Sequence, residues 1–95
     1  MSALKTRLLA QALIQKGFVE VESDHRRFFL HVLGKRTSVH TKISHGEKEL
    51  GDVLAALVAR QLALSRKELD DVVNCPLDHK GYVELLRRRG RLAPG

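Results

Sequence analysis

Hydrophobic residues follow helical spacing near the start of this 95-residue chain. They recur every three or four positions at Leu4, Leu8, Leu9, Ala12 and Leu13. This spacing predicts an amphipathic helix with one buried side. Gly17 follows where a residue with positive φ commonly ends a helix, and glycine adopts that conformation without steric cost.

The pattern then changes to the alternation of apolar and polar residues that is typical of β-strands. We expect strands over residues 18–22, 26–32 and 36–43. The segment Ser23–Asp24–His25 suits a turn, and Leu33–Gly34–Lys35 is short and contains glycine, as a hairpin connection requires. One face of the second and third strands would be apolar. That face holds Phe28, Leu30, Val32, Thr37, Val39, Thr41 and Ile43.

Helical spacing returns after Ser44–His45–Gly46 and continues almost to the C-terminus. The next helix would bury a stripe made of Leu50, Val53, Leu54, Leu57 and Val58. Ser65 and Glu68 have the spacing of a capping box, which predicts a third helix that Pro76 would end. Asp78 is placed to cap a last helix. Its inward residues would be Tyr82, Leu85 and Leu86.

The element order predicts the α+β class. Residues 1–64 would form an α-β-β-β-α core around a three-stranded antiparallel sheet, and residues 65–95 a C-terminal helical extension packed on the same domain. Helices on one face of such a sheet leave the other face open to solvent.

Charge adds a class of partner to this picture. The formal net charge is +6, and residues 1–46 hold eight Lys and Arg against three Asp and Glu. A basic surplus favours nucleic acid first, and an acidic protein or membrane headgroups second. A single cysteine excludes an intramolecular disulfide, and no apolar run approaches the roughly 20 residues that span a bilayer. We therefore expect a cytoplasmic protein with no membrane contact.

The strand alternation gathers polar residues on the open face of the sheet. The residues expected to contact RNA on or beside this face are Arg26, Arg27, Phe29, His31, Lys35, Arg36, His40, Lys42 and His45. Cations that project in one direction suit phosphate contacts, and an aromatic ring among them suits base stacking. The alternative is a face that is charged only for solubility.

Four of the five histidines lie between residues 25 and 45. Histidine titrates near neutral pH, so it can take and return a proton during RNA strand cleavage. His25 is the candidate catalyst, because it sits in a turn beside Asp24, Arg26 and Arg27. In the alternative interpretation its ring only hydrogen-bonds the turn. A zinc site is not favoured, since no His-x-x-x-His pair occurs, and we expect no cofactor.

Several of these motifs resemble the HicA family of small toxins. The likeness covers about residues 4–64: a helix ending Lys16–Gly17–Phe18, the Ser23–Asp24–His25–Arg26 turn, and Thr41–Lys42–Ile43–Ser44–His45–Gly46 before a helix beginning at Glu47. The resemblance implies a fold similar to the double-stranded RNA-binding domain. It also implies a metal-independent mRNA interferase, with the turn histidine as catalyst and a HicB-like antitoxin as partner. The family usually has Gly-Ser/Thr-His at the turn, where this chain has Asp24 before His25.

Three functions stay open at this point. The first is a HicA-like RNA endonuclease of a toxin–antitoxin pair. The second is a noncatalytic RNA-binding module that uses the same sheet face. The third is an interaction domain whose basic face binds an acidic protein.

Overall fold

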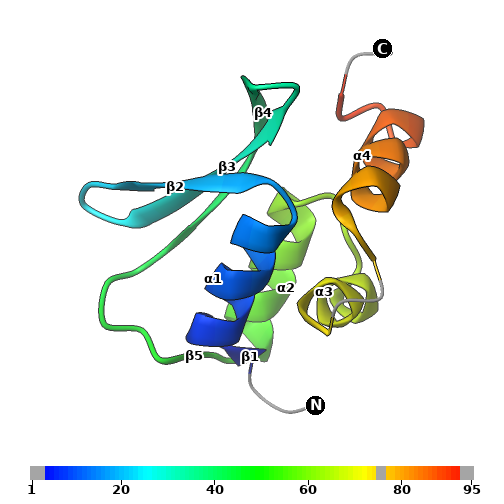
Figure 1. Ribbon diagram of the computed structural model, residues 1–95. Coiled ribbons are helices and arrows are strands. Elements are labelled where there is room, and N and C mark those ends of the chain that lie inside the picture. The colour runs from blue at the N-terminus through cyan, green and yellow to red at the C-terminus, as the bar shows by residue number, and fades with distance from the viewer. Residues whose placement is uncertain (1–3, 75–76, 93–95) are drawn as a thin grey trace.

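The computed structural model describes residues 4–74 and 77–92, so Cys75 and the helix-ending role expected of Pro76 lie outside the described residues. The described residues form an α+β fold with four helices and a three-stranded antiparallel sheet (Figure 1). The strands of this sheet are β2 (Phe18–Glu22), β3 (Arg26–Val32) and β4 (Lys35–Ile43), in that spatial order. The predicted class and sheet are therefore confirmed.

Glycines and short turns define the sheet connections. Helix α1 (Thr6–Gln15) is followed by its C-cap residue Lys16 and then by Gly17, which has a φ of +98° as expected for a helix-ending glycine. The β3–β4 hairpin turns through only Leu33 and Gly34, both with positive φ, and Lys35 already belongs to β4. Two positive-φ residues match the right-handed twist of antiparallel strands.

The first helix begins later than its pattern predicts. Leu4 and Lys5 form a short strand, β1, which pairs antiparallel with β5 (Glu49–Leu50). Thr6 then starts the helix, and its hydroxyl donates to the Glu47 carbonyl at 2.7 Å. The inclusion of Leu4 in the helix was wrong because the pairing of Leu4 with Leu50 holds this segment extended. The predicted burial of Leu8 was also wrong, since this residue is 41% exposed.

Helix α2 (Asp52–Gln61) also begins later than expected, after the extended segment at Glu49–Leu50 and Gly51. Its predicted apolar stripe is only partly buried. Leu50 and Val58 are buried, but Val53 is 83% exposed, Leu54 42% and Leu57 45%. The buried side of the helix instead presents Ala55, Val58 and Ala59. Small side chains let the helix backbone pack close to β4, and this rotates the leucines outward.

The last two helices are capped as their sequences predict. Helix α3 (Arg66–Val73) begins with a complete capping box between Ser65 and Glu68. Helix α4 (His79–Arg88) is capped by Asp78, whose carboxylate accepts from the Gly81 N–H at 2.8 Å. Both caps satisfy backbone donors that the first turn of a helix leaves free.

One hydrophobic core joins the sheet to all four helices. Helices α1 and α2 lie on one side of the sheet (Figure 1), and α3 packs against both of them. Helix α4 contributes Tyr82, whose ring stacks on Phe18 at a centroid distance of 5.9 Å. The His79 ring lies against Gly17, and its Nδ1 donates to the Lys16 carbonyl at 2.6 Å. Residues beyond position 64 thus complete the core under β2.

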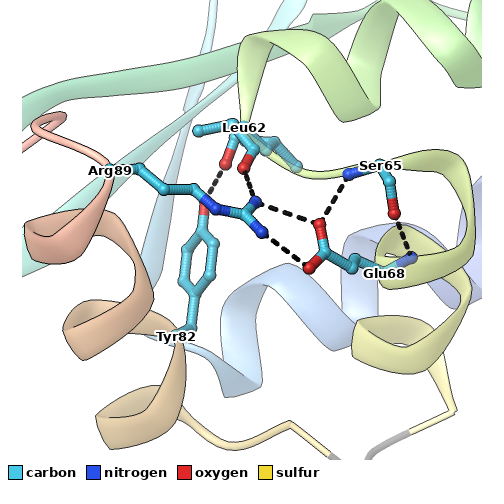
Figure 2. A network of polar contacts seen from close by, with 6 residues as sticks. Leu62, Ser65, Glu68, Tyr82 and Arg89 are labelled. Atoms are coloured by element: carbon cyan, nitrogen blue, oxygen red, sulfur yellow. Dashed lines mark hydrogen bonds and ion pairs between the residues drawn. The ribbon is translucent and has the colours of Figure 1, made fainter.

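A polar network fixes α4 to the loop between α2 and α3 (Figure 2). The Tyr82 hydroxyl donates to the Leu62 carbonyl at 2.9 Å. The Arg89 guanidinium donates to both carboxylate oxygens of Glu68, at 2.8 and 3.0 Å, and also to the Ala63 carbonyl. These bonds satisfy carbonyl groups that the end of α2 leaves unpaired.

Candidate nucleic-acid interface

The sheet face that points away from α1 and α2 carries rows of cations and imidazoles. The strand register places Arg27 opposite Lys42, Phe29 opposite His40, and His31 opposite Arg36. All six are partly or fully exposed, and no helix formed by residues 4–74 and 77–92 covers them (Figure 1). We call these six residues, Arg27, Phe29, His31, Arg36, His40 and Lys42, the outer face.

Acidic residues of the sheet lie on the other side. Glu20 and Glu22 pair in register with Phe28 and Arg26, so they alternate away from the outer face. The neighbours of the outer face on β2 are the exposed Val19 and Val21. Over strands β2, β3 and β4 the outer face is therefore positively charged without a compensating carboxylate, which favours a polyanionic ligand.

Phe29 is the centre of a stacked cluster on the outer face. The Arg36 guanidinium lies 4.2 Å from the ring centroid, and the His40 ring lies 5.2 Å away at an interplanar angle of 21°. His40 Nδ1 donates to the Ser38 carbonyl at 2.9 Å, which leaves Nε2 as the outer nitrogen of the ring. A nucleobase here would meet flat guanidinium and imidazole groups as well as the phenyl ring.

Two of the expected RNA-contacting cations lie elsewhere. Arg26 pairs with Glu20 through two hydrogen bonds, at 2.8 and 3.3 Å, and its guanidinium covers the Phe28 ring. The hydrogen bond from Arg26 lowers the pKa of Glu20 and raises the pKa of Arg26, although burial opposes both shifts. Lys35 is paired with Val32, so it alternates to the helix side of the hairpin end. The outer face thus keeps Arg27, Arg36 and Lys42 as its fixed cations.

His25 and His45 both lie at the opposite end of the sheet from the β3–β4 hairpin. His45 Nε2 donates to the Ser23 carbonyl at 3.1 Å, and the Ser23 N–H donates to the His25 carbonyl at 3.2 Å. These bonds fix the β2–β3 turn against the end of β4. The Nδ1 atom of His25 is buried and has no hydrogen-bond partner among the described residues. Nδ1 of His25 therefore makes no hydrogen bond to the turn.

A hollow of about 120 Å³ opens beside His25, which we call the His25 hollow. Its other polar residues include Lys42, Ser44, Glu47 and Gln61. Its apolar lining is Ile43, Leu50, Leu54, Leu57 and Val58. Lys42, whose side chain alternates to the outer face, also borders this hollow, so the two sites adjoin at this residue.

Sequence reasoning found the outer face but missed the hollow. Its leucines, Leu54 and Leu57, were assigned to the core. One signal was present: α2 and the preceding strand have apolar residues at 50, 53, 54, 57 and 58 as well as alanines at 55, 56 and 59, which is more than one buried face uses. Within the described residues, no group of three or more His, Cys, Asp or Glu side chains is arranged to hold a metal ion.

Family models, curated proteins and solved structures provide no match for this chain. In the ranges 4–74 and 77–92, no helix is long and apolar enough to cross a membrane.

Proposed function

We propose that this protein is a HicA-like RNA endonuclease with a fold similar to the double-stranded RNA-binding domain. The order α1, three antiparallel strands, α2 supports the fold proposal, and the turn histidine and the Thr41–Gly46 segment carry the sequence resemblance. The observation that carries the RNA proposal is the outer face, where Arg27, Arg36 and Lys42 project without a neighbouring carboxylate.

In the proposed reaction His25 is the general base. Its imidazole takes the proton of a ribose 2′-hydroxyl, the 2′-oxygen attacks the adjacent phosphorus, and the bond from phosphorus to the 5′-oxygen breaks. The products are a 2′,3′-cyclic phosphate and a 5′-hydroxyl, and a protonated histidine supplies the proton of the leaving oxygen. His45 is a candidate for that acid, because the bond from its Nε2 to the Ser23 carbonyl places it at the same turn.

Cations next to His25 would stabilise the negative charge that develops on the phosphorane. Lys42 suits this role because it lines the same hollow as His25. Arg27 stands opposite Lys42 in the register and can hold a neighbouring phosphate. Arg26 is less suited, since its guanidinium is already bonded to Glu20.

A cleavage assay in the presence of EDTA tests this proposal. We expect parent protein to cleave single-stranded RNA and to leave 2′,3′-cyclic phosphate ends, whereas His25→Ala should lose at least about a hundredfold in rate, as removal of a general base does. Lys67→Ala is the control, because Lys67 is exposed on α3 and belongs neither to the outer face nor to the hollow beside His25. If His25→Ala cleaves as fast as Lys67→Ala, His25 is not the catalyst.

A noncatalytic RNA-binding module is the second candidate. The stacked cluster of Phe29, Arg36 and His40 favours it, since stacking and phosphate contacts require no proton transfer. Salt-dependent RNA binding by the parent protein without cleavage would select this function.

A HicB-like antitoxin that covers the His25 region is proposed on the sequence resemblance alone. Its test is co-expression with a neighbouring small acidic reading frame. Relief of growth arrest by that partner would support a toxin–antitoxin pair.

A further inference from the structure

The His25 hollow has an apolar base and open apolar walls. Leu50 and Val58 are 3% and 4% exposed, and they close its base. Leu54 and Leu57 line its sides and remain 42% and 45% exposed. Exposed leucines that converge on a concave site are typical of ligand contacts, because a ligand that covers them removes apolar surface from water.

The rim of the hollow offers both donors and acceptors of hydrogen bonds. The Thr41 hydroxyl donates to Gln61 Oε1 at 2.6 Å, which fixes the amide and leaves its N–H groups without a partner among the described residues. Glu47 contributes a carboxylate acceptor, and the Ser44 hydroxyl can donate or accept a hydrogen bond. A nucleobase has donors and acceptors along its edge and apolar faces. The polar rim and the apolar floor of the hollow match these two features.

A phosphate group fits this hollow poorly. The Glu47 carboxylate would repel it, and the leucine side chains offer it no hydrogen bonds. Phosphates are better served by the outer face, where Arg27 stands opposite Lys42. Because Lys42 lines the hollow as well, a strand whose phosphates bind the outer face reaches the hollow at this residue.

We propose that the His25 hollow binds one nucleobase of the RNA strand, packed against Leu54 and Leu57 beside His25, and thereby selects the base at the cleavage position. The inference rests on the proposed RNA endonuclease function and adds to it a base-selecting site. The Gln61 amide and the Glu47 carboxylate read the base edge, while the leucines contact its faces.

Titration with the four nucleoside 5′-monophosphates, followed by methyl NMR of the whole protein, tests the site directly. We expect one of the four to shift the Leu54 and Leu57 methyl signals more than the other three. The methyl signals of Val53, which is 83% exposed and does not line the hollow, should stay in place. Equal shifts for all four nucleotides, or none at the leucines, would overturn the inference.

Filling the hollow provides the second test. In Leu57→Trp the larger side chain would occupy the space for the base, so the ratio of cleavage rates between the preferred oligonucleotide and its single-base variants should fall at least tenfold. Val53→Trp is the matched control: it puts the same ring on an exposed position of the same helix, outside the hollow. Circular dichroism would show that both variants keep the parent fold.

The outcomes separate this inference from the function beneath it. If Leu57→Trp keeps the parent base preference while RNA is still cleaved, the base-selecting site is refuted and the endonuclease proposal stands. If Val53→Trp has the same effect as Leu57→Trp, α2 contacts a ligand generally and the hollow is not the site. If the parent protein binds no RNA, the proposed function itself fails.

Discussion

The two sides of the three-stranded sheet are built from the same strands but differ in almost every property. On the helix side, Phe28, Leu30 and Thr41 are completely buried. On the outer face, Arg27, Phe29 and Lys42 occupy the alternate positions and meet solvent. The difference teaches that one residue of register separates a position in the packed core from a position on the charged surface. Substitutions on the helix side should therefore lower stability, and substitutions on the outer face should act on the proposed RNA binding.

Phe28→Ala should have the largest effect on folding. Truncating a fully buried phenylalanine costs about 3–5 kcal/mol, because it removes apolar contacts and leaves a cavity. Phe29→Ala, one position along on the outer face, should cost only about 1 kcal/mol, since it loses the contacts to Arg36 and His40. Urea denaturation of both variants measures the contrast. Similar losses would show that the outer face is also a packing surface.

Reversing charge on the outer face should have the next largest effect, on binding alone. The double variant Arg27→Glu with Lys42→Glu should weaken RNA binding by at least about tenfold. The slope of log K against the logarithm of the salt concentration should become less steep by about two. A control with the same net charge is Lys67→Glu with Arg88→Glu, both exposed on helices. Equal weakening by the two pairs would mean that net charge, rather than the outer face, attracts RNA.

Tyr82→Phe tests whether residues after position 64 contribute to the stability of the fold. The change removes the hydrogen bond to the Leu62 carbonyl but keeps the ring stacked on Phe18, so we expect a loss of about 1 kcal/mol. Burial raises the pKa of Tyr82, so its phenol should stay neutral well above its ordinary range in a spectrophotometric titration. Titration at the pH of a free tyrosine would show that α4 does not hold this ring packed against Phe18 and Leu62.

The smallest effect is expected at Glu68. Hydrogen bonds from Arg89 and then from the Ser65 backbone lower the pKa of Glu68 from 4.5 to about 2. A carboxyl group whose pKa is lower in the folded protein stabilises it above pH 4.5, and this contribution disappears as the pH falls towards 2. The pair with Arg89 is about one-third exposed, so we expect less than about 1 kcal/mol. Melting temperatures of the parent and Glu68→Gln should differ at pH 7 and converge as acid is added.

Features that depend on neighbouring residues could be predicted from the sequence. The strand alternation identified the sheet and the outer face, because a period of two fixes both sides at once. The capping box at Ser65 and the glycine after α1 were likewise read correctly. Even the orientation of Arg26 was within reach, since it shares the parity of the buried Phe28.

Features that depend on distant contacts could not be predicted. Helix α2 has apolar residues around most of its circumference, so its pattern does not say which side faces β4. In the structure α2 packs on β4 through the side that carries Ala55 and Ala59, and this leaves Leu54 and Leu57 exposed. The His25 hollow follows from that rotation. It became visible only once α2 was placed against the β2–β3 turn.

The contact between His79 and Gly17 has a consequence for anyone who shortens this protein. A side chain at position 17 would need positive φ and would meet the imidazole, since its Cβ would lie 2.5 Å from His79 Nδ1. The two positions are therefore fitted to each other across more than sixty residues. A chain cut after residue 64 would leave Phe18 and Leu62 without Tyr82, and such a fragment should self-associate through this bared surface. A minimal version of this protein has to be sought by substitution within α4 rather than by its removal.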